Sequence, residues 1–350
     1  MSVIYSRPIP QHLSSPVFAA SELGRGLTYE RPVPRIAVHK SDAAEVLLTG
    51  AARLEESRFA VAARWPCDHR LYRPASGNTG DSTFLLETVR QAAIYLSHGF
   101  YDIPLLGHSF VLSRIEIDID APGLPYDSAR PLPVLLEAVC TRAATAPRRF
   151  SMAMEATVYI GGVRRGRAHV VWEVLDERRY SLVRSRAFSE PAPGAPLAPD
   201  TGPADLLAPA VAGRQQARDV LLAADPQGVA HRWYLVLDET HPVYFDHGSD
   251  HVPGMALLEA VRQAAHAATA RAGTTHELEP WTPLSLAASF ERFAALDAPV
   301  VITADECPQR GTFGHFDFYL TATQHDQTLV RVRLRGARPA GWAGTLEEAA

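Results

Sequence analysis

Apolar and polar positions in the first half of the chain follow the period of strands, interrupted by the period of one long helix. Strict alternation over 114–119 indicates a half-buried strand. Apolar residues gather on one side of a helical period over 84–99, which predicts a helix. Gly161-Gly162 predicts a hairpin turn between two strands. The strands expected in this half cover 59–65, 114–119, 133–144, 152–160 and 168–175.

The second half repeats this order of elements. A strand over 231–238 and a loop rich in His, Asp, Pro and Gly precede a helix over 254–271. The strands expected after this helix cover 284–293, 300–305, 314–323 and 329–334. One long helix accompanied by several strands in each half predicts an α+β fold, in which an antiparallel sheet wraps around a single helix.

The two predicted helices share a polar motif. The first contains Glu87-Thr-Val-Arg90-Gln91-Ala-Ala93 and the second contains Glu259-Ala-Val-Arg262-Gln263-Ala-Ala265. The offset is 259 − 87 = 172 residues, and the same offset relates His69-x-x-Tyr72 to His241-x-x-Tyr244. A motif that returns after the length of one compact domain indicates a duplicated domain.

Changes in composition suggest where the domains begin and end. Residues 1–35 have no sustained period and are expected to form an irregular arm. Residues 191–217 are rich in Pro, Ala and Gly, which is typical of a fairly stiff linker. We therefore expect a first domain over 36–190, a second over 218–338 and a short tail over 339–350.

The polar motif forms a stripe on each helix, opposite the apolar side. A solvated face with a Glu–Arg pair one turn apart, worth a few tenths of a kcal/mol, is the simplest interpretation. However, both helices are rich in Ala and carry no other charges in their central turns, so we favour a stripe that faces a polar cavity. The stripes consist of Glu87, Arg90 and Gln91 in the first helix and Glu259, Arg262, Gln263 and His266 in the second.

The loop before the second helix reads Asp246-His247-Gly-Ser-Asp250-His251-Val-Pro253-Gly254. Pro and Gly at a helix start leave backbone N–H groups available for a carbonyl oxygen or an anion. The Asp and His residues could also be metal ligands, but the first half offers only Cys67, Asp68 and His69 at the corresponding place. Because isolated His and Asp side chains in loops more often form hydrogen bonds, we predict neither a metal nor a cofactor.

Composition and charge narrow the class of protein. The net charge of −5 and the absence of a Lys/Arg-rich block argue against nucleic acid as a partner. No apolar run reaches the roughly 18–20 residues needed for a membrane span, and the N-terminus lacks an apolar signal segment. The three cysteines, an odd number without short spacing, fit a reducing compartment. A cytoplasmic protein without a membrane or nucleic-acid partner is therefore expected.

The segment Pro253-Gly254-Met-Ala-Leu-Leu-Glu259-Ala-x-x-Gln263 resembles the central-helix signature of hotdog-fold proteins that handle acyl thioesters. Dehydratases of that fold have a histidine about fourteen residues before the glutamate, where this chain has Phe245 and, in the first half, Arg73. A fuller resemblance is to the A-factor biosynthesis (AfsA-like) hotdog family over 38–120 and 219–336. It rests on Val38-His39-Lys40, Leu48-Thr49-Gly50, both polar helices and Asp250-His251-Val-Pro-Gly-Met255.

This resemblance implies a tandem double hotdog that packs as an intrachain pseudo-dimer. It implies an acyltransferase that condenses a β-ketoacyl group with dihydroxyacetone phosphate, giving the precursor of a γ-butyrolactone or furan signal that regulates secondary metabolism. The acyl donor would be an acyl-carrier-protein or coenzyme A thioester, and a homodimer is left open. The resemblance assigns catalysis to Glu87, Arg90, Glu259 and Arg262, and we expect substrate-binding roles for Gln91, Gln263, His69, His241, Asp250, His251 and Gly254.

Elementary chemistry gives each group a task in such a reaction. A glutamate with a raised pKa would act as base, N–H groups at Gly254 would hold the oxyanion, and an arginine would bind the phosphate. We expect the thioester chemistry in the second half, which has the better loop. Two alternatives stay open at this stage: a thioesterase or dehydratase acting on acyl thioesters, and a non-catalytic sensor of acyl ligands.

Overall fold

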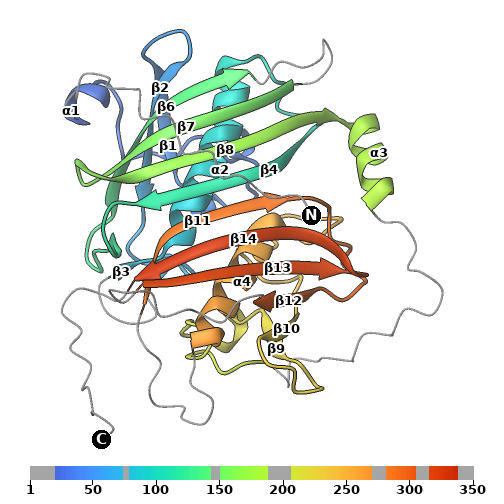
Figure 1. The fold of residues 1–350 in the computed structure, drawn as a ribbon. Coiled ribbons are helices and arrows are strands. Elements are labelled where there is room, and N and C mark those ends of the chain that lie inside the picture. Colours follow the sequence, from blue (N-terminus) through green and yellow to red (C-terminus); the bar gives the residue numbers. More distant parts are fainter. Residues whose placement is uncertain are drawn as a thin grey trace, which may run out of the picture.

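The computed structural model describes residues 20–73, 79–142, 150–187, 206–269, 281–304 and 315–337. Twelve strands in this part of the chain form one antiparallel sheet, in the order β1-β2-β6-β7-β8-β4-β11-β14-β13-β12-β10-β9. The first six belong to the first half of the chain and the last six to the second. Each half of the sheet curves around one long helix (Figure 1). The predicted α+β class and the tandem of two similar halves are confirmed.

Most strands lie where the alternating pattern predicted them. The strands of the first half are β1 (Leu48–Arg53), β2 (Arg58–Trp65), β4 (His108–Ile119), β6 (Leu132–Arg142), β7 (Phe150–Ile160) and β8 (Val163–Asp176). Those of the second half are β9 (Leu222–Ala224), β10 (Arg232–Leu235), β11 (Thr282–Phe290), β12 (Val301–Ala304), β13 (His315–Gln324) and β14 (Gln327–Ala337). A separate short pair is formed by β3 (Thr79–Gly80) and β5 (Leu124–Pro125).

The two halves join where β4 of the first half pairs with β11 of the second. The register places Ile117 opposite Leu286 and Ile115 opposite Ala288, and all four side chains are buried. Apolar side chains from both halves therefore meet in one continuous core. This edge-to-edge joint is the pseudo-dimer expected from the duplication.

Each half has one long central helix, α2 (Ser82–Phe100) and α4 (Gly254–Thr269). Asp81 caps α2 by accepting a hydrogen bond from the backbone N–H of Thr83 at 2.9 Å. Pro253 precedes the first residue of α4, a position where its missing N–H is not needed. Helix α2 packs on β4 and β8, while α4 packs on β12 and β13. None of the described helices is both long and apolar enough to cross a membrane.

A third helix, α3 (Glu177–Ala187), follows β8 and was not predicted. Its sequence is dominated by charged and polar residues and lacks the wide apolar face that reveals an amphipathic helix. Tyr180 and Val183 of α3 nevertheless line the cavity described below. The sequence of α3 does not predict its contact with the cavity, because only these two side chains make that contact.

The structure describes only parts of the predicted N-terminal arm and linker. The described part of the N-terminal arm contains one short helix, α1 (Ala20–Leu23), and 3-10 helices over Arg35–Val38 and Ala43–Glu45 follow at the start of the first half. Residues 206–217, which the linker prediction includes, pack on the second half, where Leu206 pairs with Ala223. Residues 1–19 of the arm, 191–205 of the predicted linker, the predicted helix end at 270–271 and the tail 339–350 lie outside the described residues, as do the predicted strand ends at 143–144, 305 and 314.

Candidate active site

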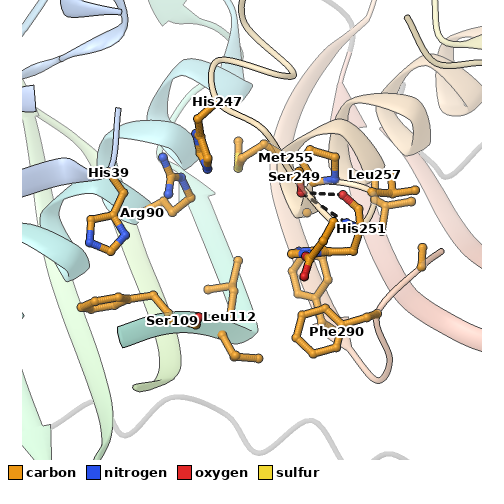
Figure 2. A pocket seen from close by; sticks show the side chains of 18 of the residues that line it. His39, Arg90, Ser109, Leu112, His247, Ser249, His251, Met255, Leu257 and Phe290 are labelled. Carbon is orange, nitrogen blue, oxygen red and sulfur yellow. Dashed lines mark hydrogen bonds and ion pairs between the residues drawn. The ribbon is translucent and has the colours of Figure 1, made fainter. Parts of the chain in front are cut away.

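A cavity of about 850 Å³ lies between the two halves of the chain. The first half contributes the segment around His39 together with α2, β4 and α3, and the second half contributes the loop before α4 and the end of β11. Figure 2 shows Arg90 and His39 on one wall, with His251 and Phe290 on the opposite wall. Because both halves line this one cavity, the domains supply different parts of a shared site.

Glu87 of α2 forms the buried end of the cavity's polar wall. Its carboxylate accepts two hydrogen bonds from Arg90, each of 2.8 Å, and one from Gln91, and Lys40 Nζ lies 3.3 Å away. Burial favours the neutral acid, but the charges of Arg90 and Lys40 outweigh it and lower the pKa of Glu87. The expected raised pKa is therefore wrong, since Lys40 adds a second cation. A carboxylate held in this way is a poor proton acceptor.

Arg90 presents its guanidinium to the cavity. Its side chain is 22% exposed, whereas that of Glu87 is only 2% exposed. Burial opposes the charge on Arg90, but the carboxylate of Glu87 raises the pKa of Arg90, so the group stays charged. Glu87 takes two of the five guanidinium N–H groups, which leaves donors on Arg90 for a ligand in the cavity. The carboxylate thus orients a cation toward the open space.

The equivalent pair in the second half lies outside the cavity. Glu259 accepts hydrogen bonds from Arg262 at 2.8 and 2.9 Å and also from Nε and Nη2 of Arg214. Arg214 further donates to Asp81 at 2.8 Å and to the carbonyl oxygen of Leu71 at 3.0 Å. Burial raises the pKa of Glu259, but the two guanidiniums more than compensate and lower it. The side chains of Arg214 and Arg262 are only 2% and 6% exposed, so this cluster is closed to ligands.

The loop before α4 is tied to the first half and forms the wall that faces Arg90. Asp246 accepts hydrogen bonds from the backbone N–H groups of Ser41 and Asp42, both at 2.8 Å. Asp250 and His251 line the cavity next to the start of α4 at Gly254. The first N–H groups of α4 have no acceptor within the helix, and they lie beside the cavity. A Cβ atom at Gly254 would lie 3.3 Å from the Phe290 ring, so glycine leaves space there.

Four residues expected to bind substrate instead hold the chain together, and none lines the cavity. Gln91 accepts from the N–H of Leu47 and donates to the carbonyl of Glu45, and Gln263 makes the equivalent bonds with Leu221 and Asp219. His69 bonds the Glu45 carboxylate through Nε2 and accepts two backbone N–H groups through Nδ1, and His241 repeats this with Asp219. Both copies therefore fasten an irregular segment to the central helix.

The comparisons with known proteins agree with this duplicated architecture. The model of the A-factor biosynthesis hotdog domain matches residues 26–176 and 197–337. The chain belongs to this family. The match covers one hotdog unit in each half, and each matched stretch contains one of the two Glu–Arg pairs. The predicted family and hotdog fold are confirmed.

Relatives within the family are similar along most of their length. One is the 2-oxo-3-(phosphooxy)propyl 3-oxoalkanoate synthase of Streptomyces virginiae, which is 33% identical over 308 residues, or 87% of this chain and 98% of the relative. A protein of the same name from Streptomyces coelicolor is 30% identical over 79% of this chain and 83% of its own. Among solved structures, the 12:0-ACP thioesterase of Umbellularia californica is 9% identical, with a TM-score of 0.47, over 80% of this chain and 98% of its own.

Sequence analysis did not identify three charged residues that lie in the clusters around Glu87 and Glu259, namely Lys40, Asp81 and Arg214. A second repeat contains the signal. Lys40 to Leu48 (KSDAAEVLL) corresponds to Arg214 to Leu222 (RQQARDVLL) with an offset of 214 − 40 = 174. Lys40 and Arg214 are thus counterparts, each next to the glutamate of its own half. The linker-like composition around Arg214 concealed this match.

The remaining candidate chemistry is a metal site in the loop before α4. Asp250 and His251 bond each other, and the carboxylate of Asp246 is occupied by backbone N–H groups. Within the described residues, no group of three or more His, Cys, Asp or Glu side chains is arranged to hold a metal ion. Asp246, Asp250 and His251 are engaged in hydrogen bonds.

Proposed function

We propose that this protein is an acyltransferase that moves a 3-oxoacyl group from a thioester to the primary hydroxyl of dihydroxyacetone phosphate. The product would be a 2-oxo-3-(phosphooxy)propyl 3-oxoalkanoate, the precursor of a γ-butyrolactone or furan signal. The observation that carries this proposal is the shared cavity, which places Arg90 on one wall and the start of α4 on the other. The name of relatives up to 33% identical over nearly their whole length supports it.

Arg90 suits the phosphate group of the acceptor. Its remaining guanidinium N–H groups can form paired hydrogen bonds with phosphate oxygens. Because Glu87 fixes the guanidinium from behind and is itself held by Gln91, Arg90 loses little further freedom when it binds an anion. We therefore assign Arg90 to acceptor binding and Glu87 to holding Arg90 in place.

The opposite wall suits the thioester. As the acceptor oxygen attacks, the carbonyl oxygen becomes negative, and the N–H groups at the start of α4 can stabilise that charge. The acyl chain would lie against apolar side chains of both halves, where burial of each methylene is worth about 0.8 kcal/mol. The apolar lining includes Ile94, Phe110, Leu112, Met255, Leu257 and Phe290.

The two Glu–Arg pairs then have different roles. The pair of the first half binds substrate at the cavity, while the second half supplies the helix start for the thioester. Glu259 and Arg262, closed off by Arg214, would stabilise the fold rather than take part in the reaction. The proposed site is therefore composite, with one chemical task assigned to each half.

The proposal is tested by supplying 3-oxoacyl thioesters of an acyl carrier protein and of coenzyme A to the purified protein. We expect thiol release that depends on dihydroxyacetone phosphate, together with the phosphorylated ester detected by mass spectrometry. Dihydroxyacetone without phosphate should react poorly. Release of free 3-oxo acid at the same rate without any acceptor would instead identify a thioesterase, and an enoyl product would identify a dehydratase.

A further inference from the structure

The proposed reaction needs a base, and neither glutamate provides one. The hydroxyl of the acceptor must lose a proton as its oxygen attacks the thioester carbonyl. Glu87 is held as a carboxylate by Arg90 and Lys40, and Glu259 lies in a closed cluster outside the cavity. The proton acceptor must therefore be sought among the other groups that line the cavity.

His251 lines the cavity and is oriented by a carboxylate. Its Nδ1 lies 2.7 Å from Asp250 Oδ1, and the hydroxyl of Tyr180 donates to the same oxygen at 2.8 Å. The Tyr180 oxygen also lies 3.2 Å from His251 Nδ1. Since Asp250 can only accept when ionised, these contacts fix the proton of a neutral His251 on Nδ1. Nε2 then carries a free lone pair, the arrangement required of a general base.

The surroundings hold this ring beside the reacting groups. The ring of Phe293 contacts His251 edge-on, with centroids 4.8 Å apart. His251 lies three residues before Gly254, so its ring and the N–H groups of α4 belong to the same wall, opposite Arg90 (Figure 2). A base and an oxyanion site on one wall, facing an anion-binding cation, match the needs of acyl transfer to a phosphorylated alcohol.

The other histidines of this cavity are placed differently. His39 Nε2 lies 2.9 Å from Nε2 of His98, which does not line the cavity, and His108 Nδ1 lies 3.1 Å from the carbonyl oxygen of Leu106, so neither ring is oriented by a carboxylate. His247 is 56% exposed at its side chain, and its Nδ1 is 3.6 Å from Asp246, beyond hydrogen-bond distance. Among the described cavity histidines, only His251 combines an orienting carboxylate with a place beside the start of α4.

We infer that His251 is the general base of the transfer, and that Asp250 and Tyr180 are its positioning residues. This inference rests on the proposed function. His251 Nε2 takes the proton of the acceptor hydroxyl while the acceptor oxygen bonds to the thioester carbonyl carbon. When the tetrahedral intermediate collapses, the C–S bond breaks and the proton passes from Nε2 to the departing sulfur. No other reactant is needed, and the base is restored at the end of each turnover.

Tyr180 gives this assignment a structural consequence. It comes from α3, which belongs to the first half, whereas Asp250 and His251 belong to the second. Arg184, one turn further along α3, also forms an ion pair with Asp250 at 3.1 Å. Helix α3 therefore fixes the base across the joint between the two halves. The other charged or titratable groups that line the cavity from the second half are Asp246 and His247 in the same loop and Glu291 and Arg292, which follow β11.

The test compares His251→Asn with His325→Asn in the full chain, using the thioester assay. We expect His251→Asn to lower kcat about 10²–10⁴-fold with little change in KM, as loss of a general base does. His325 is exposed in the turn between β13 and β14, away from the cavity, so His325→Asn should stay within about threefold of the wild type. An ester-forming wild type with a fully active His251→Asn variant would overturn the inference while leaving the proposed function intact. A wild type that makes no ester would instead refute the proposed function.

Variants of the two positioning residues keep the test decisive if His251→Asn does not fold. Asp250→Asn removes the carboxylate that orients the His251 ring, so kcat should fall at least tenfold with little change in KM. Tyr180→Phe removes a donor to the same carboxylate and should cause a smaller loss of kcat, again with little change in KM. An unchanged kcat in both variants would contradict the assignment.

Discussion

The Glu–Arg pairs of α2 and α4 have the same sequence spacing and nearly the same hydrogen-bond lengths, yet they lie in different surroundings. Glu87 and Arg90 stand at a cavity, with Lys40 as the only additional cation bound to the glutamate among the described residues. Glu259 and Arg262 are covered by Arg214. Arg214 is the counterpart of Lys40, which leaves the Glu–Arg pair of the first half open to the cavity. The helix motif is duplicated, and the segment that covers it determines whether a ligand can reach it.

The exchange of lysine for arginine accounts for much of this difference. An ammonium group is a compact point charge, whereas a guanidinium forms directed bonds in several directions at once. Arg214 uses them to join Glu259 of the second half to Asp81 and the Leu71 carbonyl of the first. One buried side chain thus connects the two halves, which fits the proposed division of roles between the two copies of the motif.

The largest expected effect separates these two roles through stability. Arg214→Met removes the partner of two buried carboxylates, which should lower the free energy of unfolding by about 3–5 kcal/mol. Its counterpart Lys40→Met leaves Glu87 paired with Arg90 and should cost less, about 1–2 kcal/mol. Urea unfolding at pH 7 measures both. Equal losses in the two variants would show that the second pair has no special role in assembly.

The next effect concerns activity and is expected only in the first half. Arg90→Gln removes the cation proposed for the phosphate, so kcat/KM for the acceptor should fall about 100-fold, on the order of 3 kcal/mol. Arg90→Lys keeps the charge without the paired donors and should recover only part of this loss. Steady-state kinetics with varied dihydroxyacetone phosphate provide the measurement. The control is Arg262→Lys, which should leave the KM of the acceptor unchanged if that pair lies outside the site.

The elements of this fold were largely predictable because each is encoded locally. The alternation around Ile115 and Ile117 and the helical period of the two Ala-rich segments identify strands and helices without any tertiary contact. Burial of Glu87 and Glu259 could also be inferred, since a stripe of Glu, Arg and Gln among small apolar residues does not suit a solvated surface. The structure shows both carboxylates only 2% exposed.

The difference between the two pairs could not be predicted in the same way. It depends on contacts such as that between Arg214 and Asp81, which are 133 residues apart and lie in irregular segments. The prediction of a raised pKa for the glutamates was wrong for the same reason, because Lys40 approaches Glu87 only in the folded chain. Likewise, Tyr180 reaches Asp250 from a polar helix whose sequence shows no apolar face. Local patterns specify elements, whereas the chemistry of this site arises where distant segments meet.

A smaller effect concerns how acid changes the free energy of unfolding through His39, a residue of the first half. Burial, reinforced by nearby His98, Arg90 and His247, lowers the pKa of His39 from the usual 6.5 of histidine to about 4. Between these values the unfolded chain binds a proton that the folded chain does not, so stability falls as the pH drops from 6.5 toward 4. His39→Asn removes this group, and Asn tolerates the positive φ of 54° at this position.

The comparison of unfolding free energies at pH 7.5 and pH 5 gives the test. Because His39 is only partly buried, we expect the wild type to lose about 1 kcal/mol more than His39→Asn over this range. The second cluster has no counterpart, since position 39 + 174 = 213 is a glycine. If the variant loses as much stability as the wild type between these pH values, His39 does not titrate below its ordinary range.

The smallest effect concerns acyl-chain length and compares two leucines related by the 172-residue offset. Leu112 of β4 lines the cavity, whereas Leu284 of β11 does not. Phenylalanine at 112 would take space from the acyl chain, and each methylene that can no longer be buried costs about 0.8 kcal/mol, roughly fourfold in kcat/KM. Leu112→Phe should therefore shift the preference toward shorter 3-oxoacyl thioesters, measured by competition between two chain lengths.

Leu284→Phe is the matched control for this prediction. It adds the same ring at the equivalent strand position of the other half, so any general disturbance of the sheet should appear in both variants. Only Leu112→Phe should change the ratio of kcat/KM values between short and long chains. A similar change in both variants would mean that the acyl chain does not lie along β4, and that the two halves contribute to chain selection alike. The division of tasks between the halves would then be confined to the Arg90 wall.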